Sequence, residues 1–201
     1  MKIGAVILVG GKSRRMGADK AALTYEGQSF LERITKELGC FDEIVLSVGD
    51  NRKYKEFGLP VVKDIYPGCG PLGGLHAALC ACKSDALFCI ACDMPLFKMS
   101  LAEHICSKAE ENFDAIVPVS MDGRIHPLCA VYKKTAAYVF AKQILSNDYK
   151  IIDAYERMKV LYVPLEETDR ADTYLFNVNT PEEYKALSER TANYSVSKST
   201  K

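Results

Sequence analysis

The sequence lacks a surplus of charge of either sign. Its 26 lysine and arginine residues balance 26 aspartate and glutamate residues, so the formal net charge at pH 7 is zero. A broad nucleic-acid surface needs a basic excess, and none is expected here. No apolar run approaches the roughly 20 residues of a membrane helix, so we expect no membrane partner. No secretory cleavage pattern follows Met1 and Lys2, and we therefore expect a cytoplasmic protein.

A loop rich in glycines and cations follows the first apolar run, which ends at Gly10 and Gly11. Glycines let backbone N–H groups approach phosphate oxygens, and cations offset the charge of a nucleoside triphosphate. The loop is no Walker loop, because Ala18 follows Gly17, and it lacks the glycine spacing of a dinucleotide loop. A solvated basic connection between a strand and a helix is the alternative. The four cationic residues are Lys12, Arg14, Arg15 and Lys20.

Apolar runs alternate with helical patterns along the chain. This alternation predicts a three-layer α/β/α protein with a mostly parallel, Rossmann-like sheet. We expect a single domain over 1–190 and a disordered polar tail over 191–201. The expected strands are 4–9, 43–48, 60–62, 86–91, 115–119, 128–132 and 159–163, and the expected helices are 30–38, 71–82, 100–111, 135–145 and 180–190.

Two of these helices carry start signals in the sequence. Ser100 is a predicted N-cap with Glu103 three residues later, the pattern of a capping box. Thr180 is the second predicted N-cap, followed by Pro181 at the first helical position and Glu183 at the third.

Polar residues follow three other apolar runs, at predicted strand exits where such sheets bind ligands: Asp64, Asp93 and the segment 177–181. Asp93 follows the fourth predicted strand, and a single carboxylate there suits Mg²⁺ on a triphosphate. The alternative is a cap of the turn at Met94 and Pro95. Asp64 can accept hydrogen bonds from a guanine edge or a ribose, or it can be a turn residue. Gly70 opens a glycine-rich segment before a helix, where anions bind readily.

The first loop resembles the signature loop of nucleotidyltransferases, Leu-x-Gly-Gly-x-Ser-x-Arg-Met-Gly-x-Asp-Lys. In detail it is similar to the molybdenum cofactor guanylyltransferase family, with Val9 where alanine is usual. The Gly10-Gly11 pair favours the guanylyl branch, because a cytidylyl enzyme would carry Ala-Gly, and the segments 92–95 and 177–181 point the same way. The matching positions are Leu8, Gly10, Gly11, Ser13, Arg15, Met16, Gly17, Asp19 and Lys20.

The resemblance implies transfer of GMP from GTP to the phosphate of molybdenum-molybdopterin, with pyrophosphate released. It implies catalytic roles for Lys20, Arg15 and Asp93, with Asp93 also holding Mg²⁺. It places the second substrate at His126, Asn177 and Asn179, although the histidine can be plain surface and the asparagines can make local turn bonds. The implied nucleotide-binding residues are Leu8, Val9, Gly10, Gly11, Lys20, Ser47, Asp64, Gly70 and Asp93.

Three further hypotheses concern the partners and the activity of the protein. Molybdoenzyme apoproteins or their chaperones are candidate protein partners of such an enzyme. One alternative function is nucleotidyl transfer to another small molecule, including molybdopterin cytidylyl transfer. The other is a non-catalytic nucleotide-binding module that delivers cofactor. The lack of a Ser/His/Asp or Cys/His set does not count against guanylyl transfer, because the attacking phosphate oxygen is already anionic.

Eight cysteines are many for a cytoplasmic protein. Without a secretory signal a disulfide framework is not expected. The pairs Cys80 and Cys82, and Cys89 and Cys92, superficially suggest zinc. Because they fall within apolar elements, we interpret them as small buried hydrophobic residues.

Overall fold

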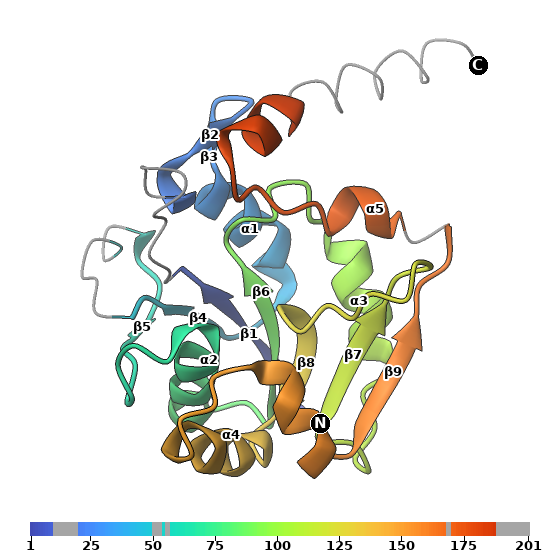
Figure 1. Cartoon of the computed structure of the whole chain (residues 1–201). Coiled ribbons are helices and arrows are strands. Elements are labelled where there is room, and N and C mark those ends of the chain that lie inside the picture. Colours follow the sequence, from blue (N-terminus) through green and yellow to red (C-terminus); the bar gives the residue numbers. More distant parts are fainter. Residues whose placement is uncertain (10–19, 50–53, 55–56, 168–169, 188–201) are drawn as a thin grey trace.

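The computed structural model describes residues 1–9, 20–49, 54, 57–167 and 170–187, built around one seven-stranded sheet (Figure 1). The strand order is β5-β4-β1-β6-β8-β7-β9. The strands are β1 (Ile3–Leu8), β4 (Ile44–Ser47), β5 (Val61–Val62), β6 (Ala86–Ala91), β7 (Ala115–Val119), β8 (Cys129–Lys133) and β9 (Val160–Pro164).

One strand runs against all the others in this sheet. β1 pairs in parallel with β4 and β6, β4 with β5, and β7 with β9, whereas β8 is antiparallel to both β6 and β7. Six strands therefore share a direction, and the predicted mostly parallel sheet is confirmed. The reversal at β8 was not foreseen from the sequence.

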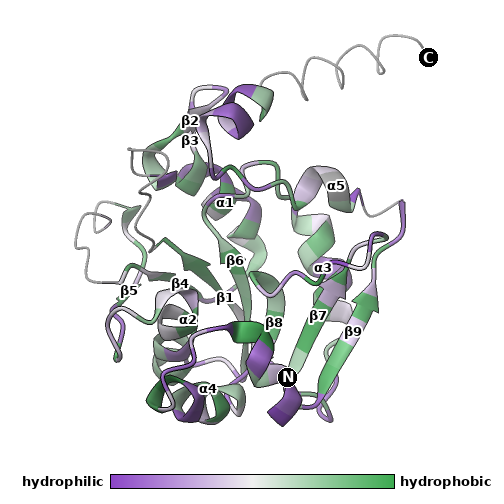
Figure 2. Cartoon of the chain, viewed as in Figure 1, coloured by the Kyte–Doolittle hydropathy of each residue, from purple (hydrophilic) through white to green (hydrophobic). Residues whose placement is uncertain are grey.

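Helices cover both faces of the sheet. α1 (Phe30–Glu37) and α3 (Met99–Ser107) pack on one face, and α2 (Gly70–Ala81) and α4 (Ala136–Leu145) on the other. Within β1, Ala5 and Ile7 join the first core cluster while Val6 and Leu8 join the second, as the alternation of a strand requires. The central strands are accordingly hydrophobic on both faces (Figure 2), and the predicted three-layer arrangement is confirmed.

A small third cluster lies beyond one end of the sheet. Tyr25, Phe30, Leu96, Val178 and Leu187 bury one another there. They tie the hairpin of β2 (Thr24–Tyr25) and β3 (Gln28–Ser29) to α1 and to the helical segment 181–187. Sequence reasoning missed this hairpin because each strand has only two residues.

The predicted start of α3 was wrong. Ser100 lies inside the helix, whose N-cap is Lys98, and no side chain of the cap accepts a hydrogen bond. Instead, Glu37 of α1 accepts a bond from the backbone N–H of Met99 at 3.0 Å, so the cap comes from another helix. α3 also ends at Ser107, short of the predicted end near residue 111.

The start of the last helix was predicted correctly. The carboxylate of Glu183 accepts bonds from the backbone N–H groups of Asn179 and Thr180, at 2.6 and 3.0 Å. The N–H of Glu183 in turn donates to the Thr180 hydroxyl at 3.2 Å. The segment is helical over 181–187, while its predicted end and the tail 191–201 lie outside the described residues, so the extent of the predicted domain stays a prediction.

The short helices of the described chain that were not anticipated are η1 (Lys20–Ala22), η2 (Leu38–Cys40), η4 (Ile151–Arg157) and α5 (Ala171–Tyr174). Among the described residues, no helix is long and apolar enough to cross a membrane.

Candidate functional site

A lysine, an aspartate and an asparagine from distant parts of the chain meet at the carboxyl edge of the sheet. The Nζ atom of Lys20 lies 3.0 Å from the Oδ2 atom of Asp93 and 2.5 Å from the Oδ1 atom of Asn179. The side chains of Lys20 and Asp93 are each only 17% exposed. The ammonium group of Lys20 thus contacts both Asp93, the predicted metal ligand, and Asn179, a predicted second-substrate residue.

Backbone hydrogen bonds hold this arrangement together. β1 and β6 are neighbours, and just past their ends the N–H of Cys92 donates to the carbonyl of Leu8 at 3.1 Å. The carbonyl of Asp93 then accepts from the N–H of Val178 at 2.9 Å. The segment 177–179 is therefore fixed beside Asp93, although more than 80 residues separate them in the sequence.

The two carboxylate oxygens of Asp93 differ in their partners. Its Oδ1 atom is buried and has no hydrogen-bond partner among the described residues. A buried carboxylate oxygen without a partner carries a cost, and a cation or a donor removes that cost. Mg²⁺ binds one or two carboxylates and completes its coordination shell with phosphates and water. A single carboxylate, that of Asp93, is therefore enough to hold this ion.

A second group of predicted residues gathers around the start of α2. A Cβ added at Gly74 would overlap the Oγ atom of Ser47, and would lie 3.5 Å from both the Oδ1 atom of Asp64 and the side chain of Leu8. A Cβ at Gly73 would lie 3.6 Å from the Oδ2 atom of Asp64. These side chains therefore pack against the helix backbone, and a side chain at Gly74 would displace the Ser47 hydroxyl.

Two neighbouring predicted residues adjoin this group. The N–H of Val9 donates to the carbonyl of Ser47 at 2.8 Å, which joins the exits of β1 and β4. Gly70 begins α2 with a positive φ of 61°, a conformation that favours glycine. Leu8, Val9, Ser47, Asp64 and Gly70 all lie at the carboxyl edge, and their assignment to nucleotide stays a prediction.

His126 lies in the loop between β7 and β8, at the same edge. Its Nε2 atom is hydrogen-bonded to the Oγ atom of Ser120. Burial lowers the pKa of His126, and the positive charge of Arg124 lowers it further. The buried Tyr132 hydroxyl donates to the carbonyl of Pro127 at 2.8 Å and so fixes the backbone next to His126.

The two asparagines behave differently. Asn179 accepts from Lys20, as described above, whereas the side-chain amide of Asn177 donates to the carbonyl of Leu175 at 3.1 Å. The local turn bond considered for these residues is therefore present at Asn177. Sequence reasoning missed Ser120 and Tyr132, because neither stands in a motif.

Other predicted site residues lie outside the described part of the chain. These are Gly10, Gly11 and Arg15, together with the remaining cations of the first loop before Lys20. Their roles stay predictions.

The cysteines are largely buried, as expected. Cys69, Cys82, Cys89, Cys92 and Cys129 are buried, and burial raises the pKa of the Cys106 thiol to about 12. The interpretation was wrong for Cys80, which is exposed in the last turn of α2. Over the described ranges, no three His, Cys, Asp or Glu side chains group as a metal site.

The fold and the position of the site define the class as an α/β nucleotidyltransferase. A solved structure titled molybdopterin-guanine dinucleotide biosynthesis protein A, from Archaeoglobus fulgidus, matches with a TM-score of 0.82 and 28% identity, over 96% of this chain and 100% of that chain. The fold of 2-C-methyl-D-erythritol 4-phosphate cytidylyltransferase from Thermus thermophilus is also similar, with a TM-score of 0.67 and 16% identity over 94% and 98% of the two chains.

The family follows from the sequence comparisons. The family model described as "MobA-like NTP transferase domain" matches residues 5–158. A probable molybdenum cofactor guanylyltransferase of Clostridium perfringens is 38% identical over 193 residues, 93% of this chain and 96% of the relative. Another, from Carboxydothermus hydrogenoformans, is 34% identical over 90% and 92% of the two chains. The chain therefore belongs to the MobA-like NTP transferase family.

Proposed function

We propose that the chain transfers GMP from GTP to the phosphate of molybdenum-loaded molybdopterin and releases pyrophosphate. The observation that carries the proposal is the meeting of Lys20, Asp93 and Asn179 around one ammonium group. The names of the relatives supply the substrates, since they are probable molybdenum cofactor guanylyltransferases of nearly equal length.

In the proposed reaction, a phosphate oxygen of the second substrate forms a bond to the α-phosphorus of GTP. The bond from that phosphorus to the bridging oxygen of the β-phosphate breaks, and its electron pair leaves with pyrophosphate. The attacking oxygen is already anionic, so the protein has no proton to remove. The task of the protein is to align two polyanions and to offset their charge.

The described residues divide this task. Lys20 offers an ammonium group that can follow the charge of the departing pyrophosphate. Asp93 holds Mg²⁺, which when bound supplies Lewis-acid stabilisation of the phosphate charge. Asn179, bonded to the same ammonium group, is the residue we assign to the second substrate, with His126 and Asn177 on the same edge.

The residues around the start of α2 select the nucleotide base in this proposal. The carboxylate of Asp64 and the hydroxyl of Ser47 lie against Gly73 and Gly74, and we assign them to the guanosine part of GTP. A carboxylate can accept hydrogen bonds from the N–H groups of a guanine edge or from ribose hydroxyls. We also propose that the protein works in the cytoplasm and passes its product to molybdoenzyme apoproteins or their chaperones.

The experiment that tests the function is a turnover assay with the full chain, Mg²⁺, GTP and molybdenum-loaded molybdopterin. Pyrophosphate and the guanine dinucleotide should appear in equal amounts, and neither should form without the second substrate. Calorimetric titration with GTP and CTP in Mg²⁺ should show tighter binding of GTP. Tighter binding of CTP would favour cytidylyl transfer instead. Binding of GTP without turnover would favour a non-catalytic module that delivers cofactor.

A further inference from the structure

Helix α1 contacts both chain segments that carry the charged pair of the site. Ala21, next to Lys20 in the 3-10 helix η1 (Lys20–Ala22), packs in the same core cluster as Leu31 and Ile34 of α1. At the start of α1, the N–H of Phe30 donates to the carbonyl of Leu23 at 2.8 Å. Met94 and Phe97, in the segment that follows Asp93, join the same cluster, so α1 supports both segments.

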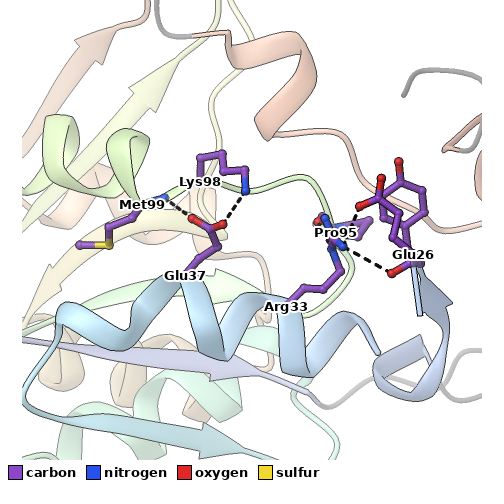
Figure 3. A network of polar contacts seen from close by, with 7 residues as sticks. Glu26, Arg33, Glu37, Pro95, Lys98 and Met99 are labelled. Carbon is purple, nitrogen blue, oxygen red and sulfur yellow. Dashed lines mark hydrogen bonds and ion pairs between the residues drawn. The ribbon is translucent and has the colours of Figure 1, made fainter. Parts of the chain in front are cut away.

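Arg33 makes the direct link between these two segments. Its Nε atom donates to the carbonyl of Pro95 at 3.2 Å, two residues beyond Asp93. Its Nη1 atom lies 3.4 Å from the carbonyl of Tyr25 and 3.0 Å from the carboxylate of Glu26, in the hairpin that follows Lys20 (Figure 3). The guanidinium carbon also lies 4.8 Å from the centre of the Tyr25 ring.

The geometry of this link is specific to arginine. The planar guanidinium group places its donors in a fixed fork, so that one side chain reaches Pro95 and the hairpin together, whereas a lysine ammonium is a single point. The side chain of Arg33 is 17% exposed, while that of Glu26 is 56% exposed. The ion pair with Glu26 therefore contributes little, and the carbonyl bonds and the ring contact matter more.

The turn held by Arg33 has little other freedom. Met94 and Leu96, on either side of Pro95, are buried. Proline fixes its own φ angle. A displacement of the Pro95 carbonyl would therefore be passed along the backbone to Asp93.

We propose that Arg33 is a positioning residue for metal-bound nucleotide: by holding the Pro95 carbonyl against the hairpin, it sets the place of the Asp93 carboxylate relative to Lys20. The inference rests on the proposed function, because it assigns Mg²⁺ to Asp93. The contacts of Arg33 are with Pro95, Tyr25 and Glu26, so it acts on the Asp93 carboxylate through the backbone.

The test measures how much Mg²⁺ improves the affinity for GTP. Calorimetry on the full chain gives the dissociation constant of GTP with Mg²⁺ and with EDTA, and their ratio is the magnesium gain. Asp93→Asn should abolish the gain. Arg33→Met keeps the length of the side chain without its donors and should reduce the gain about tenfold, as loss of an outer support of a metal ligand does. The magnesium gain of Arg33→Lys should lie between those of Arg33→Met and the wild type.

Two controls separate positioning from a general loss of structure. Glu37→Gln removes the charge that holds Lys98 and the start of α3, one turn further along α1 (Figure 3), and should leave the magnesium gain unchanged. In the Asp93→Asn background, Arg33→Met should change GTP affinity no further, because both changes act through the same carboxylate. Thermal unfolding of each variant shows that it is folded at the temperature of the titration.

The outcomes are distinct. A folded Arg33→Met chain with the wild-type magnesium gain overturns the inference, and so does a further loss of affinity in the Asp93→Asn background. If Arg33→Met fails to fold, Arg33→Lys decides by the same criterion. A wild-type chain that gains nothing from Mg²⁺ instead contradicts the magnesium role in the proposed function, on which the inference rests.

Discussion

The two sides of the site are built on different physical principles. On the close-packed side (Ser47, Asp64, Gly73 and Gly74), side chains touch the bare backbone of α2. On the charged side (Lys20, Asp93 and Asn179), one ammonium group links two acceptors. Added volume should therefore disturb the close-packed side, and loss of charge should disturb the charged side, so that different substitutions test each one.

The largest effect is expected from Asp93→Asn, which keeps volume but removes the charge. Turnover should fall about 10²- to 10³-fold, as it does when one group that stabilises transition-state charge is lost. Pyrophosphate release measures the effect, with circular dichroism to confirm the fold. Asp85→Asn is the control, since that exposed carboxylate accepts a bond from the backbone N–H of Lys2 just before β6, at the opposite edge of the sheet. Equal rates for the two variants would contradict the role of Asp93.

The next effect is expected on the close-packed side, from Gly74→Ala. The added methyl group overlaps the Ser47 hydroxyl, so the free energy of unfolding should fall by about 1–3 kcal/mol and GTP binding should weaken. Urea unfolding and calorimetry measure the two losses.

A second substitution sharpens this result. Removing the overlapped hydroxyl with Ser47→Ala in the Gly74→Ala chain should restore much of the stability, because neighbouring changes of opposite volume compensate. Gly39→Ala is the matched control, since a Cβ at Gly39 meets nothing within 4 Å. A loss at Gly74 that Ser47→Ala does not reduce would show that the contact is not the cause.

The smallest effect is a pH dependence that involves one histidine on α2 and one in the loop between β7 and β8. Burial lowers the pKa of His76 on α2, and burial with the charge of Arg124 lowers the pKa of His126. The unfolded chain therefore takes up protons first as the pH falls through about 6.5, and stability should decrease from there toward the folded pKa values. Urea unfolding between pH 7.5 and 5 measures the slope, which His76→Asn and His126→Asn should each reduce. If neither variant changes the slope, the pH dependence comes from other titratable groups.

The sequence predicted the sheet well because buried strands are continuous apolar runs with clear ends. β1 and β6 illustrate this, and the polar residues at their exits do gather at one edge. The capping box at Thr180 could also be predicted, because it lies within four consecutive residues. What could not be predicted depends on distant contacts. The N–H of Met99 is satisfied by Glu37, and the reversed direction of β8 follows from pairing that no local pattern encodes.

The charged side shows the same limit. Lys20, Asp93 and Asn179 could each be named from a motif, but their sharing of one ammonium group could not. The contact of Gly74 with Ser47 likewise needs the packing of α2 on β4. Arg33 stands in no motif, and its bond to the Pro95 carbonyl appears only in the structure.

The reversed direction of β8 has a consequence for the loop that carries His126. Because β7 ends and β8 begins at the same edge, the loop 120–128 leaves and returns on the site side of the sheet. A parallel successor would have required the chain to travel to the opposite edge first. Lengthening such a surface loop costs little, about 0.6 kcal/mol for each doubling. The sheet thus offers a place where a chain can gain or lose residues around His126 while both strands keep their register.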